Sequence, residues 1–214
     1  MPQAPDVCAH GQPCSPQRRA DVGSALRLEY LTVGWNVLEG VVALTAALAA
    51  GSVALLAFGI DSFVEVSSGV ILIWRLRAED GLTDRHAVET LDRRARKLVA
   101  LSLFALAAYV AVDAVAALIQ RAVPQPTLVG LALTAVSLVV MGWLARAKRR
   151  IARALGSAAM ESDAFQTSTC WWLSLIALAG IGLNTALGWW WADPVAALSM
   201  APLILREGPG RLAQ

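Results

Sequence analysis

Apolar stretches long enough to cross a lipid bilayer recur along most of this 214-residue chain, and they constrain its fold more than any other feature. A helix needs about 20 residues to cross a hydrocarbon core of roughly 30 Å. Backbone groups in hydrocarbon must be hydrogen-bonded within the segment, so such stretches span as helices. The predicted spans are residues 30–50, 53–74, 98–119, 128–144, 158–187 and 191–205. We therefore predict an all-α bundle of six transmembrane helices.

The residues outside these spans leave little room for a soluble domain. Residues 1–28 contain four prolines, several charges and no apolar core of a signal peptide, so we predict a disordered N-terminal tail. Residues 29–206 are predicted to form the transmembrane domain, and residues 207–214 a short C-terminal tail.

Positive charges are distributed unevenly between the predicted loops. Seventeen of the 18 Lys and Arg residues fall in the two tails or in the links after the second and fourth spans, and only Arg121 falls on the opposite side. Because cytoplasmic loops retain positive charge, both termini are predicted to face the cytoplasm. The net charge of +2 therefore reflects membrane orientation and gives no basis for nucleic-acid binding.

Two acidic residues in the second span need an explanation, because a carboxylate at the bilayer centre costs on the order of 2.5–3.5 kcal/mol. Asp61 and Glu65 are four residues apart, so they share one helix face. Two ionised carboxylates there repel, and the pair lowers its energy by binding protons or by sharing a cation. The pair cannot bind protons and share a cation at the same time. Such a site can therefore exchange protons for a metal ion across the membrane. The alternative is a structural ion pair, which the absence of any predicted Lys or Arg at membrane depth disfavours.

The fifth span carries a second pair of candidate ligands with the same spacing. Gln166 and Cys170 also share a helix face. An amide oxygen and a thiolate could complete a four-ligand metal site with the two carboxylates. Taken alone the pair would be weak support, because polar residues hold membrane helices together and cysteine often packs as a small apolar group.

Three segments of the sequence resemble the cation diffusion facilitator family of transporters. Residues 51–62 followed by Glu65 resemble the family's second transmembrane helix, residues 157–170 its fifth, and residues 191–196 the start of its sixth. The resemblance covers roughly residues 28–208 in the family's order and topology.

The resemblance implies export of zinc or a related divalent ion from the cytoplasm, in exchange for protons and without a further cofactor. It also implies a dimer of identical chains in the lipid bilayer of a bacterial inner membrane. The family's two acidic ligands match Asp61 and Glu65, whereas its His and Asp on the fifth helix are replaced by Gln166 and Cys170. These departures concern the identity of the metal and the number of protons exchanged rather than the fold.

Two further departures concern segments outside the spans. The family's cytoplasmic metal-binding domain would follow the sixth helix, and only eight residues follow Arg206, so the sequence resembles a short, divergent branch without that domain. The histidine-rich run usual between the second and third helices is reduced here to His86 with nearby acidic residues, for which a solvated surface is the favoured interpretation.

Several other polar residues have two interpretations each. Asn36 and Glu39 in the first span could flank the ion path or form an interhelical hydrogen bond. For Asp113, near the outer end of the third span, a structural role is the favoured interpretation. Asp163 could form part of the cytoplasmic entrance to the ion path or cap the fifth helix. The tail could catch a soft metal ion, although an unstructured set of ligands binds poorly. The residues that would do so are Cys8, His10 and Cys14.

Two other functional classes stay open. The chain could be a membrane protein that senses metal, or a partner of a transporter, because the replaced ligands fit a site that has lost the transport cycle. It could also be a membrane-embedded hydrolase, but neither histidine lies in a span and no serine and histidine arrangement is present at membrane depth. We therefore predict no enzymatic activity.

Overall fold

The computed structural model describes residues 16–79, 85–125 and 127–212 and confirms the all-α architecture. Over these residues the chain forms six helices, with the bounds α1 Pro16–Ala50, α2 Val53–Glu79, α3 Arg85–Gln120, α4 Leu128–Leu155, α5 Ala158–Leu187 and α6 Ala192–Leu212. Four are long and apolar enough to cross a membrane, and the apolar parts of α3 and α6 are shorter. Each helix matches one predicted span.

Local signals in the sequence set several helix ends. Thr127 and Ser157 are the N-caps of α4 and α5, and their hydroxyls accept hydrogen bonds from the backbone amides of Gly130 and Met160. Such caps satisfy amides that have no partner inside the helix. Gly156 ends α4 in the left-handed conformation, φ 59°, which glycine adopts without strain.

Five of the described helices extend beyond the predicted spans, among them α2 to Glu79 instead of 74, α3 from Arg85 instead of 98, and α6 to Leu212 instead of 205. Helix α1 begins at Pro16 within the segment predicted as a tail, and α4 continues to Leu155 instead of ending at 144. Hydropathy marks only the part of a helix that lies in hydrocarbon. Good helix formers such as Arg, Ala and Leu continue the helix past that part.

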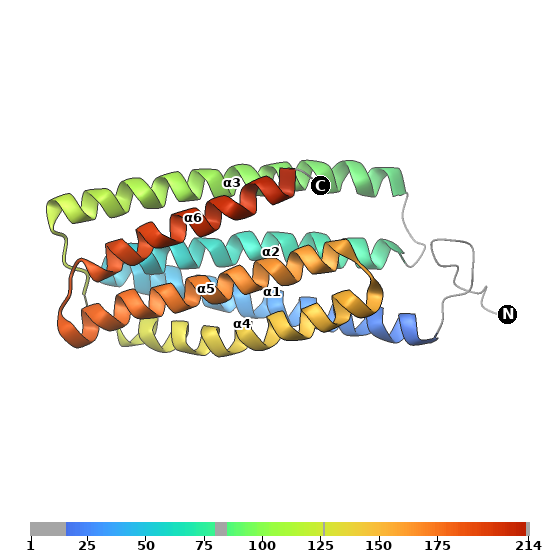
Figure 1. Ribbon diagram of the computed structural model, residues 1–214, viewed down its shortest axis with the longest axis horizontal. Coiled ribbons are helices and arrows are strands. Elements are labelled where there is room, and N and C mark those ends of the chain that lie inside the picture. Colours follow the sequence, from blue (N-terminus) through green and yellow to red (C-terminus); the bar gives the residue numbers. More distant parts are fainter. Residues whose placement is uncertain (1–15, 80–84, 126, 213–214) are drawn as a thin grey trace.

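The helices run side by side along one long axis, and the described chain begins and ends toward the same end of the bundle (Figure 1). The most extensive helix pairings are α1 with α2, α4 with α5, and α3 with α6, and α2 also packs against α5. Alanines on the facing sides of α1 and α2, among them Ala43, Ala47, Ala54 and Ala57, are buried. Small residues of this kind let membrane helices approach closely.

Polar side chains gather inside this bundle while large apolar ones lie on its surface. Leu48, Ile119 and Val139 are more than 70% exposed, as expected of side chains that face lipid. Glu29, Glu39, Asp61, Glu65, Lys148 and Asp163 are buried. Ionisable residues placed in this way mark candidate ion paths in membrane proteins.

Candidate metal and proton site

The acidic pair on α2 lies in the interior of the bundle, as the sequence predicted. Asp61 and Glu65 are 4% and 1% exposed. Both are on the part of α2 that runs between α1 and α5, and α2 packs against both of these helices. Neither oxygen of the Glu65 carboxyl has a hydrogen-bond partner within the described part of the chain.

The pair on α5 faces the same region. Gln166 and Cys170 are buried, and the Cys170 thiol and the Thr167 hydroxyl lie beside the Glu65 carboxyl. The structure thus brings Glu65 and Cys170 together, with Asp61 and Gln166 each one turn away on their helices. Among the side chains that the structure describes, no three of His, Cys, Asp or Glu are arranged to hold a metal ion. The four-residue ligand set therefore stays a prediction.

A second polar group surrounds Glu39 on α1. Its carboxylate accepts hydrogen bonds from Ser62 on α2 at 3.4 Å and from Ser137 on α4 at 3.0 Å. Ser137 is also 3.2 Å from the hydroxyl of Ser174 on α5. Glu39 therefore makes the interhelical hydrogen bonds that the sequence allowed for. Asn36 is fully buried, and its amide group has no hydrogen-bond partner among the described residues.

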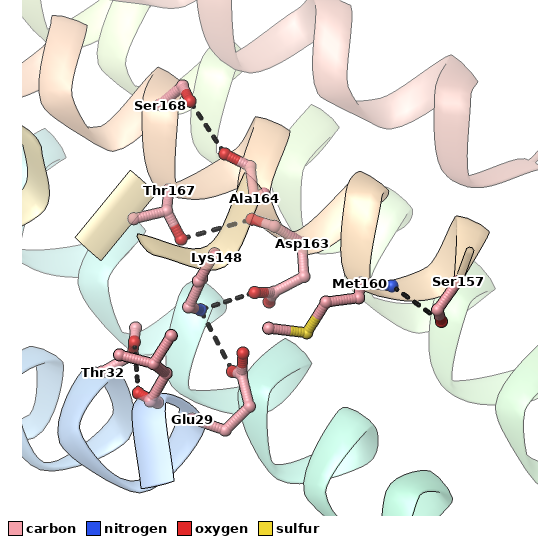
Figure 2. A network of polar contacts seen from close by, with 10 residues as sticks. Glu29, Thr32, Lys148, Ser157, Met160, Asp163, Ala164, Thr167 and Ser168 are labelled. Atoms are coloured by element: carbon pink, nitrogen blue, oxygen red, sulfur yellow. Dashed lines mark hydrogen bonds and ion pairs between the residues drawn. The ribbon is translucent and has the colours of Figure 1, made fainter. Parts of the chain in front are cut away.

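The structure also places a lysine inside the bundle, where the sequence predicted none. Lys148 on α4 is fully buried, and its Nζ lies 3.1 Å from Oε2 of Glu29 on α1 and 2.5 Å from Oδ2 of Asp163 on α5. Figure 2 shows these two ion pairs meeting at the ammonium. We call these three residues the Lys148 cluster. The sequence analysis placed Lys148 in the link after the fourth span, whereas the structure buries it inside the bundle as part of α4.

The spacing of buried residues on α4 contains the signal that could have found Lys148. Met141, Leu144, Ala145 and Ala152 are buried along one face of this helix, and Lys148 lies on that face. These intervals of three and four residues follow the helical period. Extending that pattern past the apolar part of the helix predicts that the Lys148 side chain lies in the interior of the bundle.

The other candidate residues have the following places. Asp163 does not cap α5, because Ser157 does. Asp113 is partly buried on α3. Cys8, His10 and Cys14 lie outside the described residues, so their role stays a prediction.

Asp193, at the start of α6, has a structural role that the sequence did not indicate. Its carboxylate accepts hydrogen bonds from the Ser52 hydroxyl at 2.5 Å and from the backbone amides of Val53 and Ala54 at 2.9 and 3.4 Å. These are the first amides of α2, which have no partner within their own helix. A residue of α6 thus caps α2.

The sequence is similar to those of known membrane transporters. The family profile described as the cation efflux transmembrane domain matches residues 31–211. An uncharacterized transporter of Synechocystis is 26% identical over 161 residues, which cover 74% of this chain and 52% of that protein. The chain therefore spans about half the length of this curated relative.

Proposed function

This chain belongs to the cation efflux family, and from that premise we propose that it exports a divalent metal ion, with zinc as the expected ion, in exchange for protons. Asp61 and Glu65 would bind the metal together with Gln166 and Cys170. The two carboxylates would also carry the protons. Helix movements around this site would open it to each side of the membrane in turn. The proposed assembly is a homodimer in a bacterial inner membrane.

The environment of the Glu65 carboxyl is the observation that supports this proposal most directly. It is 1% exposed, and its two oxygens have no hydrogen-bond partner among the described residues. A buried carboxylate in this state is costly, because the neighbouring Cys170 thiol, Thr167 hydroxyl and Lys148 ammonium replace its hydration only in part. A bound proton or a metal ion removes that cost, and each excludes the other.

The neighbours of Glu65 fit a borderline metal better than a hard one. The Cys170 thiol lies beside it, and thiolates prefer Zn²⁺ or Cd²⁺ over Mg²⁺ or Mn²⁺. Gln166 contributes a neutral oxygen in place of a charged ligand. The proposed ligand set of two carboxylates and one thiolate then carries three negative charges against the two positive charges of the ion.

The test is metal flux into proteoliposomes with an imposed pH gradient, measured for Zn²⁺, Cd²⁺ and Mn²⁺. We expect Asp61→Asn and Glu65→Gln to abolish flux, because each removes charge that the ion needs. Both variants should still insert into the membrane, because a neutral side chain is cheaper to bury. Glu161→Gln, at an exposed position in the first turn of α5, is the control and should keep normal flux.

Two results would change the proposal. Normal flux in Asp61→Asn or Glu65→Gln would show that the ion binds elsewhere. Metal-dependent release of protons from the wild-type protein without any flux would identify a sensor or partner protein that keeps the site but lacks the transport cycle.

A further inference from the structure

The Lys148 cluster lies close to the proposed metal site, on the side nearer the ends of the described chain. Asp163 precedes Gln166 on α5 by about one helical turn, and Glu29 lies in the first half of α1. Both α1 and α5 have these parts toward the end of the bundle where the described chain begins (Figure 1). The cluster therefore lies between the proposed site and that end of the bundle.

The cluster holds more negative charge than its lysine neutralises. Lys148 pairs with Glu29 and Asp163, and Glu65 of α2 is a third carboxylate within electrostatic reach of its ammonium. Oxygen Oε1 of Glu29 is buried and has no hydrogen-bond partner in the described part of the chain. The three carboxyl groups outnumber the single ammonium that lies among them.

An ammonium held in this way competes with soluble cations. A monovalent ion that displaced it would bring the same charge and would also lose its own hydration, so it would gain nothing. A divalent ion brings twice the charge and is attracted to each carboxylate twice as strongly, although it gives up a larger hydration that the carboxylates must replace. Lysine suits this role because its charge is compact and its four-carbon stem is flexible.

Building on the proposed function, we propose that Lys148 is a tethered cation that makes the path selective for divalent ions by excluding monovalent ones from the Lys148 cluster. Lys148 is then a specificity-determining residue that binds no metal. A purely structural lysine would tie α1, α4 and α5 together equally well. The two roles differ in metal flux, because only the first predicts that a soluble monovalent cation that takes the place of the ammonium inhibits the passage of the divalent ion.

The experiment measures thermal unfolding of the full-length protein in detergent, in KCl and in choline chloride at equal ionic strength. Choline is too large to take the place of an ammonium group, so it controls for salt effects. Lys148→Met keeps the apolar stem and removes the charge, leaving Glu29 and Asp163 buried without their partner. We expect K⁺ to raise the Tm of this variant over choline by about 3–6 °C for each tenfold excess over its Kd. The wild-type Tm should be the same in both salts.

Two matched variants complete the test. Lys148→Arg retains the charge and should not respond to K⁺. The triple variant Glu29→Gln/Lys148→Met/Asp163→Asn removes all three charges and should also not respond. If Lys148→Met does not fold, Glu29→Gln/Lys148→Met leaves the single carboxylate of Asp163, and its Tm in KCl and in choline chloride is compared in the same way. An equal Tm in K⁺ and choline for the folded variant would overturn the proposal and leave Lys148 with a structural role.

A flux measurement separates this proposal from the proposed function. Excess K⁺ should inhibit Zn²⁺ flux through Lys148→Met and leave wild-type flux unchanged. Absence of Zn²⁺ flux in the wild type would reject the proposed function, whereas the response of Tm to K⁺ would still test whether a soluble cation can occupy the position of the ammonium. Unchanged Zn²⁺ flux through Lys148→Met in excess K⁺ would count against the selectivity role.

Discussion

Cys170 is the residue through which the metal preference of the proposed site is most directly tested. It is buried beside Glu65, and a thiolate ligand favours soft or borderline ions. Cys170→Ser should therefore weaken Cd²⁺ flux far more than any residual Mn²⁺ flux. Binding as a thiolate releases the thiol proton, so metal affinity of the wild type should rise with pH, and the variant should lose part of that dependence.

The matched control is Cys8→Ser/Cys14→Ser, which removes two thiols from the N-terminal segment and leaves Cys170 in place. Its metal ranking in the same vesicles should equal that of the wild type. If Cys170→Ser keeps the wild-type order of metals and its pH dependence, Cys170 only packs against its neighbours and does not bind the ion.

At the same scale, sequence reasoning found the acidic pair and missed the lysine. Asp61 and Glu65 were predictable because a carboxylate within a long apolar stretch is conspicuous. Lys148 was not, because it follows the apolar stretch of its helix among other basic residues. Its burial depends on Glu29 and Asp163, which are 119 and 15 residues away in the chain. Which helices pair with one another is a tertiary property that local spacing does not contain.

At the scale of the helices, the contact between α5 and α6 depends on a glycine. A Cβ added to Gly180 would lie 2.6 Å from Cβ of Ala196 and 3.2 Å from the carbonyl oxygen of Ala192. Gly180→Ala should therefore push α6 away from α5 and destabilise the protein by about 1–3 kcal/mol. The measurement is thermal unfolding in detergent.

Gly34 on α1 is the control for that substitution. A Cβ added there meets no atom of the described residues within 4 Å, so Gly34→Ala should be neutral or slightly stabilising, since alanine is the better helix former. Equal Tm values for Gly180→Ala and Gly34→Ala would show that α5 and α6 are not in close contact at this point.

The existence of all the described helices was predictable from hydropathy, and so were several of their ends: α1 ends at Ala50, α4 begins at Leu128 and α5 spans Ala158–Leu187, as predicted. Each span gave a helix, yet α1 and α4 extend 14 and 11 residues beyond the predicted limits of residues 30 and 144. Glu29 and Lys148 lie in these extensions, and both are buried. The parts of the helices that hydropathy does not mark therefore contribute two of the three residues of the Lys148 cluster, and the predicted fifth span contributes Asp163.

For the whole molecule, the distribution of Lys and Arg predicts that both termini are cytoplasmic. The native cysteines provide the test. Cys8 and Cys14 precede α1, whereas Cys170 is buried, so a membrane-impermeant maleimide should modify only the first two. We expect labelling in inside-out membrane vesicles and none in intact cells. Cys8→Ser/Cys14→Ser should abolish the labelling, and labelling of intact cells would reverse the orientation.

The cap that Asp193 provides for α2 also bears on how the protein is made. Ser52 and Asp193 are 141 residues apart, so at translation rates of about 5–20 residues per second α2 leaves the ribosome roughly 7–28 s before its cap. During that interval its first amides have no carboxylate partner. Helix α2 carries Asp61 and Glu65, so the proposed site reaches its final arrangement only when the last helix has been inserted. A nascent chain stalled before Asp193 would expose this unfinished helix start to the quality-control proteases of the membrane.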